Sequence, residues 1–165
     1  MKIYLDSCVL ISYYSKHNEE KERKKIVKKA LEIFSHITDV EFYISSWGIS
    51  EMKNILLSRQ RKSHSEKFAQ DCEIDLRSKN RLGDLKIKII KVNGNKKNYD
   101  SEDFFFEVGK VNSKYHPGLG DAIHCVIMEN NEIKHIITFD DKDDFKKIEG
   151  LFVMNPHNLF IKDEN

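Results

Sequence analysis

Residues 2–6, Lys-Ile-Tyr-Leu-Asp, decide how the start of this chain folds. The three apolar residues after Lys2 form a short run that is typical of a buried β-strand, and Asp6 follows them directly. A second apolar run begins at Val9, so the carboxylate of Asp6 lies between two buried segments. An unpaired buried charge is unfavourable, and this stretch therefore predicts a carboxylate with a partner at the carboxyl end of the first strand.

Similar elements recur along the rest of the chain. Short apolar runs predict strands, and longer segments with apolar residues at helical spacing predict helices. We expect strands over residues 3–5, 41–44, 87–92, 135–139 and 151–154, and helices over residues 8–14, 19–37, 49–56, 64–80, 101–114 and from 121 onward, after a break at 117–120. Strands that alternate with helices predict an α/β fold, a three-layer α/β/α sandwich with a mostly parallel central sheet.

The length and composition of the chain suit one globular domain. Its 165 residues allow a real core but not two ordinary domains, so we expect a single domain over residues 1–165. A hydrophobic share of 39% with a charged share of 33% excludes a wholly disordered chain. The net charge of +1 does not by itself indicate a nucleic-acid binder, although basic residues are more frequent early and acidic residues late.

The cysteines and the absence of long apolar stretches indicate a cellular compartment. Cys8, Cys72 and Cys125 are odd in number and show no zinc-binding spacing, so we expect free thiols in a reducing environment. No apolar signal segment follows the N-terminus, and no stretch is long enough to span a membrane. We therefore expect a cytoplasmic protein without a membrane partner.

Four acidic residues are expected at one edge of the predicted sheet. Asp6 and Asp140 each follow a strand, while Glu51 lies early in the helix after the second strand and Asp121 begins a later helix. The carboxyl ends of parallel strands meet at the same edge, where ligands bind. Taken alone, Asp121 is explained by the helix dipole, Glu51 as a surface acid and Asp140 as part of an acidic turn.

Together, the four carboxylates predict a site for a hard divalent cation, Mg²⁺ or Mn²⁺. Clustered anions repel one another, and such a cation removes the repulsion. It can also lower the pKa of bound water and stabilise the charge that develops on a phosphate. The chemistry indicated is phosphodiester hydrolysis, with all four acids as metal ligands and catalytic residues.

The motifs around these acids resemble those of the PIN-domain nucleases in order and approximate spacing. They are Tyr4-Leu5-Asp6-Ser7, Ile49-Ser50-Glu51-Met52, Gly120-Asp121-Ala122-Ile123-His124 and Ile136-Ile137-Thr138-Phe139-Asp140. The resemblance covers nearly the whole chain and implies a Rossmann-like fold and two-metal-type cleavage of single-stranded or structured RNA with Mg²⁺ or Mn²⁺. Many small members are toxins of bacterial toxin–antitoxin pairs of the VapC type, which adds an antitoxin protein and a homodimer to the candidate partners.

The chain departs from the family pattern after the fourth acid. Members often place an aromatic residue three positions after that acid, whereas Phe145 comes two positions later here. Asp140 is carried over as the fourth acid, and Asp143 and Asp144 are candidates for a further ligand.

Several other polar residues have a functional and a structural explanation. Ser7 and Thr138 match positions that help to hold a carboxylate or metal-bound water, but a hydroxyl bonded to the backbone at a strand end explains them equally well. His124 lies one helical turn after Asp121, where a packed histidine is favoured over a proton donor. A basic group that could follow an RNA backbone, or form an ordinary solvated surface, consists of Lys53, Arg59, Arg61 and Lys62.

Other families fit the sequence less well. A haloacid-dehalogenase-like phosphatase would have a second Asp at the position of Cys8, and a response-regulator receiver would have an acidic pair where Ser7 stands. The remaining alternative is a catalytically inactive PIN-like module that binds RNA or a protein. All four acids are present, which favours the enzyme.

Overall fold

The computed structural model describes residues 1–59, 62–92, 102–139 and 144–159. Within this part of the chain, six strands form one sheet in the order β3-β4-β2-β1-β5-β6. Neighbouring strands are parallel except for the antiparallel pair β3 and β4. The strands are β1 Lys2–Leu5, β2 Glu41–Ser45, β3 Arg81–Leu82, β4 Leu85–Ile90, β5 His135–Ile137 and β6 Phe152–Met154.

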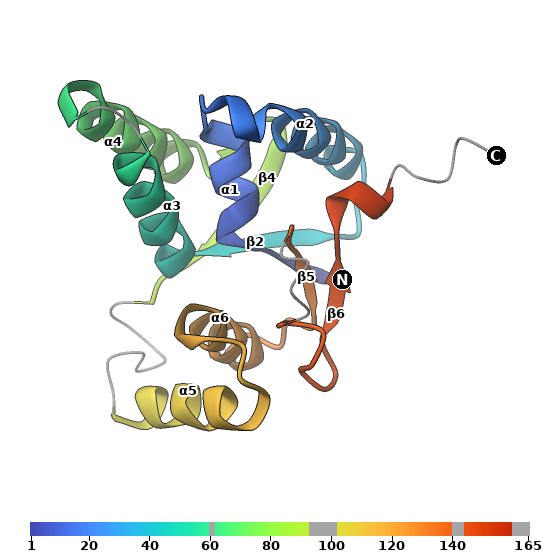
Figure 1. The fold of residues 1–165 in the computed structure, drawn as a ribbon. Coiled ribbons are helices and arrows are strands. Elements are labelled where there is room, and N and C mark those ends of the chain that lie inside the picture. The colour runs from blue at the N-terminus through green and yellow to red at the C-terminus, as the bar shows by residue number, and fades with distance from the viewer. Residues whose placement is uncertain (60–61, 93–101, 140–143, 160–165) are drawn as a thin grey trace.

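Helices cover both faces of this sheet and complete a three-layer sandwich (Figure 1). The first four helices lie on one face, and α5 and α6 lie on the other. Their bounds are α1 Ser7–Tyr14, α2 Lys21–Ser35, α3 Ser46–Ser58, α4 Lys62–Lys79, α5 Glu102–Tyr115 and α6 Leu119–Asn130, with short 3-10 helices η1 Asn18–Glu20 and η2 Pro156–Leu159. The predicted α/β/α sandwich with a mostly parallel sheet is therefore confirmed.

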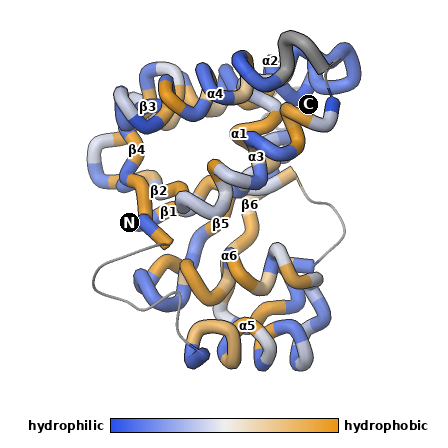
Figure 2. Tube along the Cα trace, turned by 90° about the vertical axis from the view of Figure 1, so that its left-hand side faces the viewer, coloured by the Kyte–Doolittle hydropathy of each residue, from blue (hydrophilic) through white to orange (hydrophobic). Residues whose placement is uncertain are grey.

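The core consists of two hydrophobic clusters, one on each side of the sheet. Side chains alternate along a strand, so Ile3 and Leu5 of β1 pack under α1 to α4 while Tyr4 packs under α5 and α6. Figure 2 shows hydrophobic residues along the strands and a largely hydrophilic α2 at the surface. Because β1 is covered on both faces, its three apolar residues, Ile3, Tyr4 and Leu5, are all buried.

Two features differ from the sequence-based expectation. The predicted break over residues 117–120 is too long, because α6 begins at Leu119 after Gly118, whose φ of 92° is readily adopted only by glycine. Strand β3 was not predicted, since two residues are too few to show a period. It forms because Gly83, with φ of 61°, closes a tight turn into β4.

The topology brings three strand ends together at one edge of the sheet. β1 is central and runs parallel to β2 on one side and to β5 on the other. The residues that end or follow these strands are Asp6, Ser45 and Thr138. They therefore lie near one another although they come from the beginning, the middle and the end of the chain.

No helix in the described part of the chain is both long enough and apolar enough to cross a membrane.

Candidate functional site

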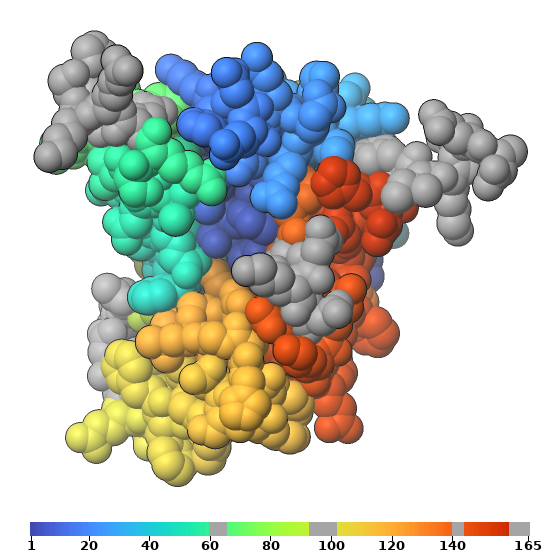
Figure 3. All heavy atoms as spheres, viewed as in Figure 1, coloured from blue at the N-terminus to red at the C-terminus, as the bar shows by residue number. Residues whose placement is uncertain are grey.

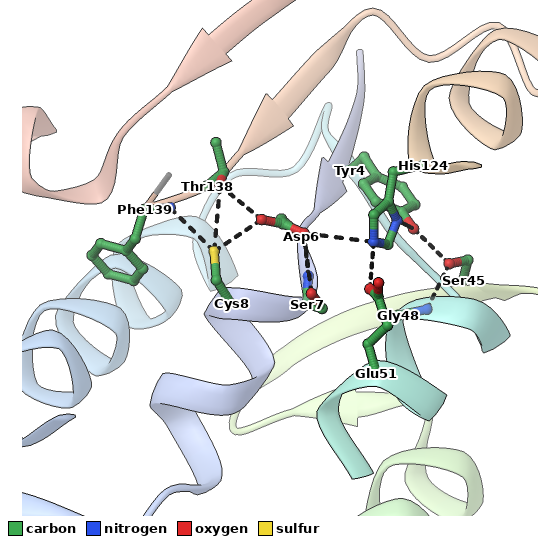
Figure 4. A network of polar contacts seen from close by, with 10 residues as sticks. All are labelled: Tyr4, Asp6, Ser7, Cys8, Ser45, Gly48, Glu51, His124, Thr138 and Phe139. Carbon is green, nitrogen blue, oxygen red and sulfur yellow. Dashed lines mark hydrogen bonds and ion pairs between the residues drawn. The ribbon is translucent and has the colours of Figure 1, made fainter. Parts of the chain in front are cut away.

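Asp6 is the buried carboxylate at the end of β1. The residue is only 5% exposed, and its side chain accepts a hydrogen bond of 2.6 Å from the backbone N–H of Ser7, which caps α1. The hydroxyl of Thr138, from the segment after β5, donates to the other carboxylate oxygen at 2.7 Å. The Ser7 hydroxyl adds a longer contact of 3.3 Å. These donors fix the orientation of Asp6 from two neighbouring strand ends (Figure 4).

Cys8 joins this group, although the sequence suggested only a free thiol for it. Its Sγ donates to Asp6 Oδ2 at 3.0 Å, lies 3.3 Å from Thr138 Oγ1, and accepts the N–H of Phe139 at 3.2 Å. Burial and the nearby Asp6 charge raise the pKa of the thiol well above its ordinary value. Cys8 is therefore a neutral donor that helps to hold Asp6.

Glu51 meets Asp6 through His124. Glu51 lies in α3 and His124 in α6, and the imidazole Nε2 donates to Glu51 Oε2 at 2.6 Å while lying 3.7 Å from Asp6 Oδ1. Two carboxylates from different elements thus converge on one nitrogen atom. His124 is 1% exposed, so this meeting point is shielded from bulk water.

The charges at this meeting point are mutually stabilising. Burial lowers the pKa of His124, but the hydrogen bond that it donates to Glu51 and the charges of Asp6, Glu51 and Asp121 outweigh burial and raise it above its ordinary value. Burial raises the pKa of Glu51, but His124 outweighs that effect and lowers it. The pair therefore favours an imidazolium beside a carboxylate.

Behind His124 lies a chain of buried hydroxyl groups. Its Nδ1 is 2.7 Å from the Tyr4 hydroxyl, which is 2.5 Å from the Ser45 hydroxyl. Ser45 also accepts the N–H of Gly48 at 3.0 Å and so caps α3. This chain connects the middle of the sheet to the Glu51 carboxylate.

Neither Tyr4 nor Ser45 was predicted to belong to the site. A signal for Tyr4 was present, since a tyrosine hydroxyl within an apolar strand needs a hydrogen-bond partner when it is buried. Ser45 caps α3, and nothing in its sequence context indicates the contact of its hydroxyl with Tyr4.

Of the remaining predicted acids, the structure describes two and leaves two outside the described residues. Asp121 is half-buried in the first turn of α6, and its charge raises the pKa of both His124 and Cys125. Asp140 and Asp143 lie outside the described residues. Asp144 is described and pairs with Lys147 at 3.2 Å.

The predicted basic group is partly engaged in ion pairs. Lys53 pairs with Glu73 at 2.9 Å, and Arg59 pairs with the buried Glu20 at 2.8 Å. Arg61 and the side chain of Lys62 lie outside the described residues. Contact of Lys53 or Arg59 with RNA would compete with these intramolecular partners.

The chemistry of the donor set fits a hard divalent cation. Asp6 and Glu51 offer carboxylate oxygens, the ligands that Mg²⁺ and Mn²⁺ prefer. In the described part of the chain, no three side chains among His, Cys, Asp and Glu come together as a metal site by themselves. A cation held by Asp6 and Glu51 would therefore need further ligands, and Asp140 is the predicted acid whose position is not described.

The site lies on an accessible face of the molecule. In the space-filling view, the dark blue atoms of the β1 and α1 segment lie between α3, α6 and the C-terminal elements (Figure 3). Glu51 remains 27% exposed at its side chain, in contrast to His124. A ligand can therefore approach the Glu51 carboxylate from the solvent side.

Comparisons with known proteins identify related folds. VapBC2 from Rickettsia felis, solved bound to a DNA fragment from its promoter, matches with a TM-score of 0.59 and 16% identity over 94% of this chain and 98% of that chain. The sarcin-ricin loop cleaving toxin VapC20 from Mycobacterium tuberculosis matches with a TM-score of 0.57 and 12% identity over 84% and 91%. A toxin–antitoxin complex from Klebsiella pneumoniae matches with a TM-score of 0.55 and 22% identity over 93% and 97%.

These identities are low, so the structural matches show a shared fold. A comparison with curated proteins gives no match. The family model of the PIN domain, in contrast, matches residues 3–151. This range includes the segments of Asp6, Glu51, Asp121 and Asp140. The chain therefore belongs to the PIN domain family.

Proposed function

We propose that this protein is a metal-dependent endoribonuclease that hydrolyses phosphodiester bonds in RNA. The observation that carries the proposal is the convergence of Asp6 and Glu51 on one edge of the sheet, within 4 Å of the same imidazole nitrogen. A solved relative of this fold is described as a toxin that cleaves the sarcin-ricin loop, which favours RNA as the substrate class.

Asp6, Glu51, Asp121 and Asp140 would hold Mg²⁺ or Mn²⁺. When bound, such a cation lowers the pKa of a coordinated water and stabilises charge on the phosphate. Thr138, Ser7 and Cys8 orient Asp6, and His124 orients Glu51. Asp143 and Asp144 would assist through water, and Lys53, Arg59, Arg61 and Lys62 would attract the RNA backbone.

A purified sample tests the nuclease proposal directly. We expect cleavage of single-stranded RNA with Mg²⁺ or Mn²⁺ and none with EDTA, with restoration when excess Mn²⁺ is added back. Equal cleavage in EDTA would contradict the metal mechanism. RNA binding without cleavage under any metal condition would favour the inactive RNA-binding module instead.

We also propose that the protein is the toxin of a toxin–antitoxin pair. One solved structure of this fold, from Klebsiella pneumoniae, is described as a toxin–antitoxin complex, and this description supports the proposal. Expression of the protein alone should inhibit growth of the host cells. Co-expression with the product of the adjacent upstream gene should relieve this inhibition and yield a complex of the two proteins that purifies together. Growth inhibition that the neighbouring product does not relieve would exclude that product as the antitoxin.

A further inference from the structure

The buried residues behind Glu51 suggest how its carboxylate is oriented. Glu51 projects from a helix and is partly exposed, so α3 alone leaves its side chain several rotamers. The contact with His124 removes this freedom at one oxygen, Oε2. The other oxygen, Oε1, lies 3.1 Å from the point where a Cβ on Gly120 would stand.

The hydrogen bonds of this chain can be assigned for both protonation states of His124. A carboxylate only accepts, so His124 Nε2 carries the proton that it donates to Glu51. In the imidazolium, Nδ1 donates to the Tyr4 hydroxyl, which donates to Ser45. In the neutral ring, Nδ1 accepts from Tyr4, and Ser45 donates to Tyr4. Ser45 accepts the Gly48 N–H in both states, so the chain from Ser45 to Glu51 stays connected.

The far end of the chain is anchored in rigid structure. Tyr4 is fully buried in the central strand, and Ser45 ends the neighbouring strand and caps α3. The imidazole packs against the Tyr4 ring, with the centroids 5.5 Å apart, and its Cε1 lies 3.4 Å from a Cβ position on Gly48. The ring of His124 can therefore neither rotate nor withdraw without disrupting these contacts.

We infer that Tyr4 and His124 are positioning residues that hold the Glu51 carboxylate in the orientation needed to bind a divalent cation. This inference rests on the proposed function. Neither residue needs to touch the cation or the RNA, because both act through Glu51. Groups that orient metal-binding carboxylates typically change metal affinity by about 10-fold to 100-fold when they are removed.

Two substitutions of His124 separate the two ends of its ring. The His124→Gln side chain can place an amide N–H near the position of Nε2, so it keeps a donor for Glu51 and loses the link to Tyr4. The His124→Asn side chain places its amide near Nδ1, so it keeps the link to Tyr4 and loses the donor for Glu51. Both variants remove the ring, and a role in packing alone predicts similar effects.

Mn²⁺ affinity, measured by calorimetry without RNA, is the first readout. We expect His124→Asn to weaken binding by about 100-fold, and Tyr4→Phe and His124→Gln by about 10-fold or less. The matched control is Tyr43→Phe, because Tyr43 is the register partner of Tyr4 on β2 and its hydroxyl bonds to the exposed Glu41. Equal losses in His124→Asn and His124→Gln, or wild-type affinity in His124→Asn, would overturn the inference.

The second readout needs no metal and separates this inference from the nuclease proposal. In NMR spectra of the apo protein, the Glu51 carboxyl ¹³C signal, assigned from its loss in Glu51→Gln, should shift in His124→Asn more than in His124→Gln. An unshifted signal in both variants would overturn the positioning role. If the wild-type protein binds Mn²⁺ but cuts no RNA, the proposed function fails while the affinity order still decides the inference. If the wild-type protein binds no Mn²⁺, the metal mechanism fails, and the carboxyl signal alone shows whether His124 orients Glu51.

Discussion

Asp6 and Glu51 are neighbours at the site, but they are held there by different kinds of structure. Asp6 follows a central strand and accepts hydrogen bonds from the next residue in the chain and from the end of an adjacent strand. Glu51 projects from a helix and depends on a side chain from another helix, 73 residues away. The first carboxylate is fixed by the sheet, and the second by a connected set of side chains.

This difference predicts where the site is robust and where it is sensitive. Asp6 has several independent donors, so loss of any one of them leaves its position nearly intact. The 2.6 Å hydrogen bond that orients Glu51 comes from one histidine, whose own orientation depends on Tyr4. Substitutions that do not touch either carboxylate should therefore affect Glu51 more than Asp6.

The largest effect is expected when Asp6 itself loses its charge. Asp6→Asn keeps the shape of the side chain but removes the anion, and we expect RNA cleavage to fall by about 100-fold to 1000-fold, as for other key electrostatic groups. Cleavage rates with a circular dichroism spectrum will show whether activity is lost without unfolding. Asp71→Asn, at an exposed position on α4, is the control, and full activity in Asp6→Asn would mean that the site is misplaced.

Asp140 tests whether a second acid near a strand end behaves like Asp6. It lies outside the described residues, but β5 ends at Ile137, only three positions earlier. We expect Asp140→Asn to reduce the cleavage rate on the order of 100-fold, and the double change Asp143→Asn with Asp144→Asn to reduce it much less. The reverse order in a kinetic assay would show that the longer spacing to Phe145 has moved the ligand to a later position in the sequence.

A smaller effect is expected when one donor to Asp6 is removed. Thr138→Val keeps the shape of the buried side chain and deletes the 2.7 Å hydrogen bond. Because the Ser7 and Cys8 donors remain, we expect Mn²⁺ affinity to fall by about 10-fold, the lower end of the range for such groups. Thr38→Val, at an exposed position, is the control in the same titration. A loss as large as that of His124→Asn would contradict the difference between the two carboxylates.

The smallest effect on Mn²⁺ affinity is expected from alanine substitutions at two glycines, Gly120 beside Glu51 and Gly48 beside His124. A Cβ at Gly120 would stand 3.1 Å from Glu51 Oε1, whereas a Cβ at Gly48 would make ordinary contacts of 3.4–3.8 Å. Both lie in helices, where alanine is favoured over glycine by about 1 kcal/mol. We expect Gly48→Ala to raise thermal stability with unchanged Mn²⁺ affinity, and Gly120→Ala to weaken affinity by up to about 10-fold. Equal affinities in the two variants would show that Glu51 is free to move aside.

The same difference explains how much could be predicted from the sequence. Asp6 and Thr138 were identifiable because a polar residue after a buried strand has a position that the sheet determines. The hydrogen bond between Glu51 and His124 was not predicted, because it joins two helices whose relative placement depends on the packing of the whole domain. The start of α6 and the short strand β3 were missed for a local reason, since each depends on a glycine with positive φ.

The order of strands in the sheet also bears on when the site can assemble during synthesis of the protein. The contact between Thr138 and Asp6 joins residues that are 132 positions apart. Since β1 pairs with β5, the central strand acquires one of its two neighbours only after β5 has left the ribosome. Until then a nascent chain carries Asp6 without the surroundings that orient it. Contacts between such distant segments also form slowly, which further delays the appearance of an assembled site.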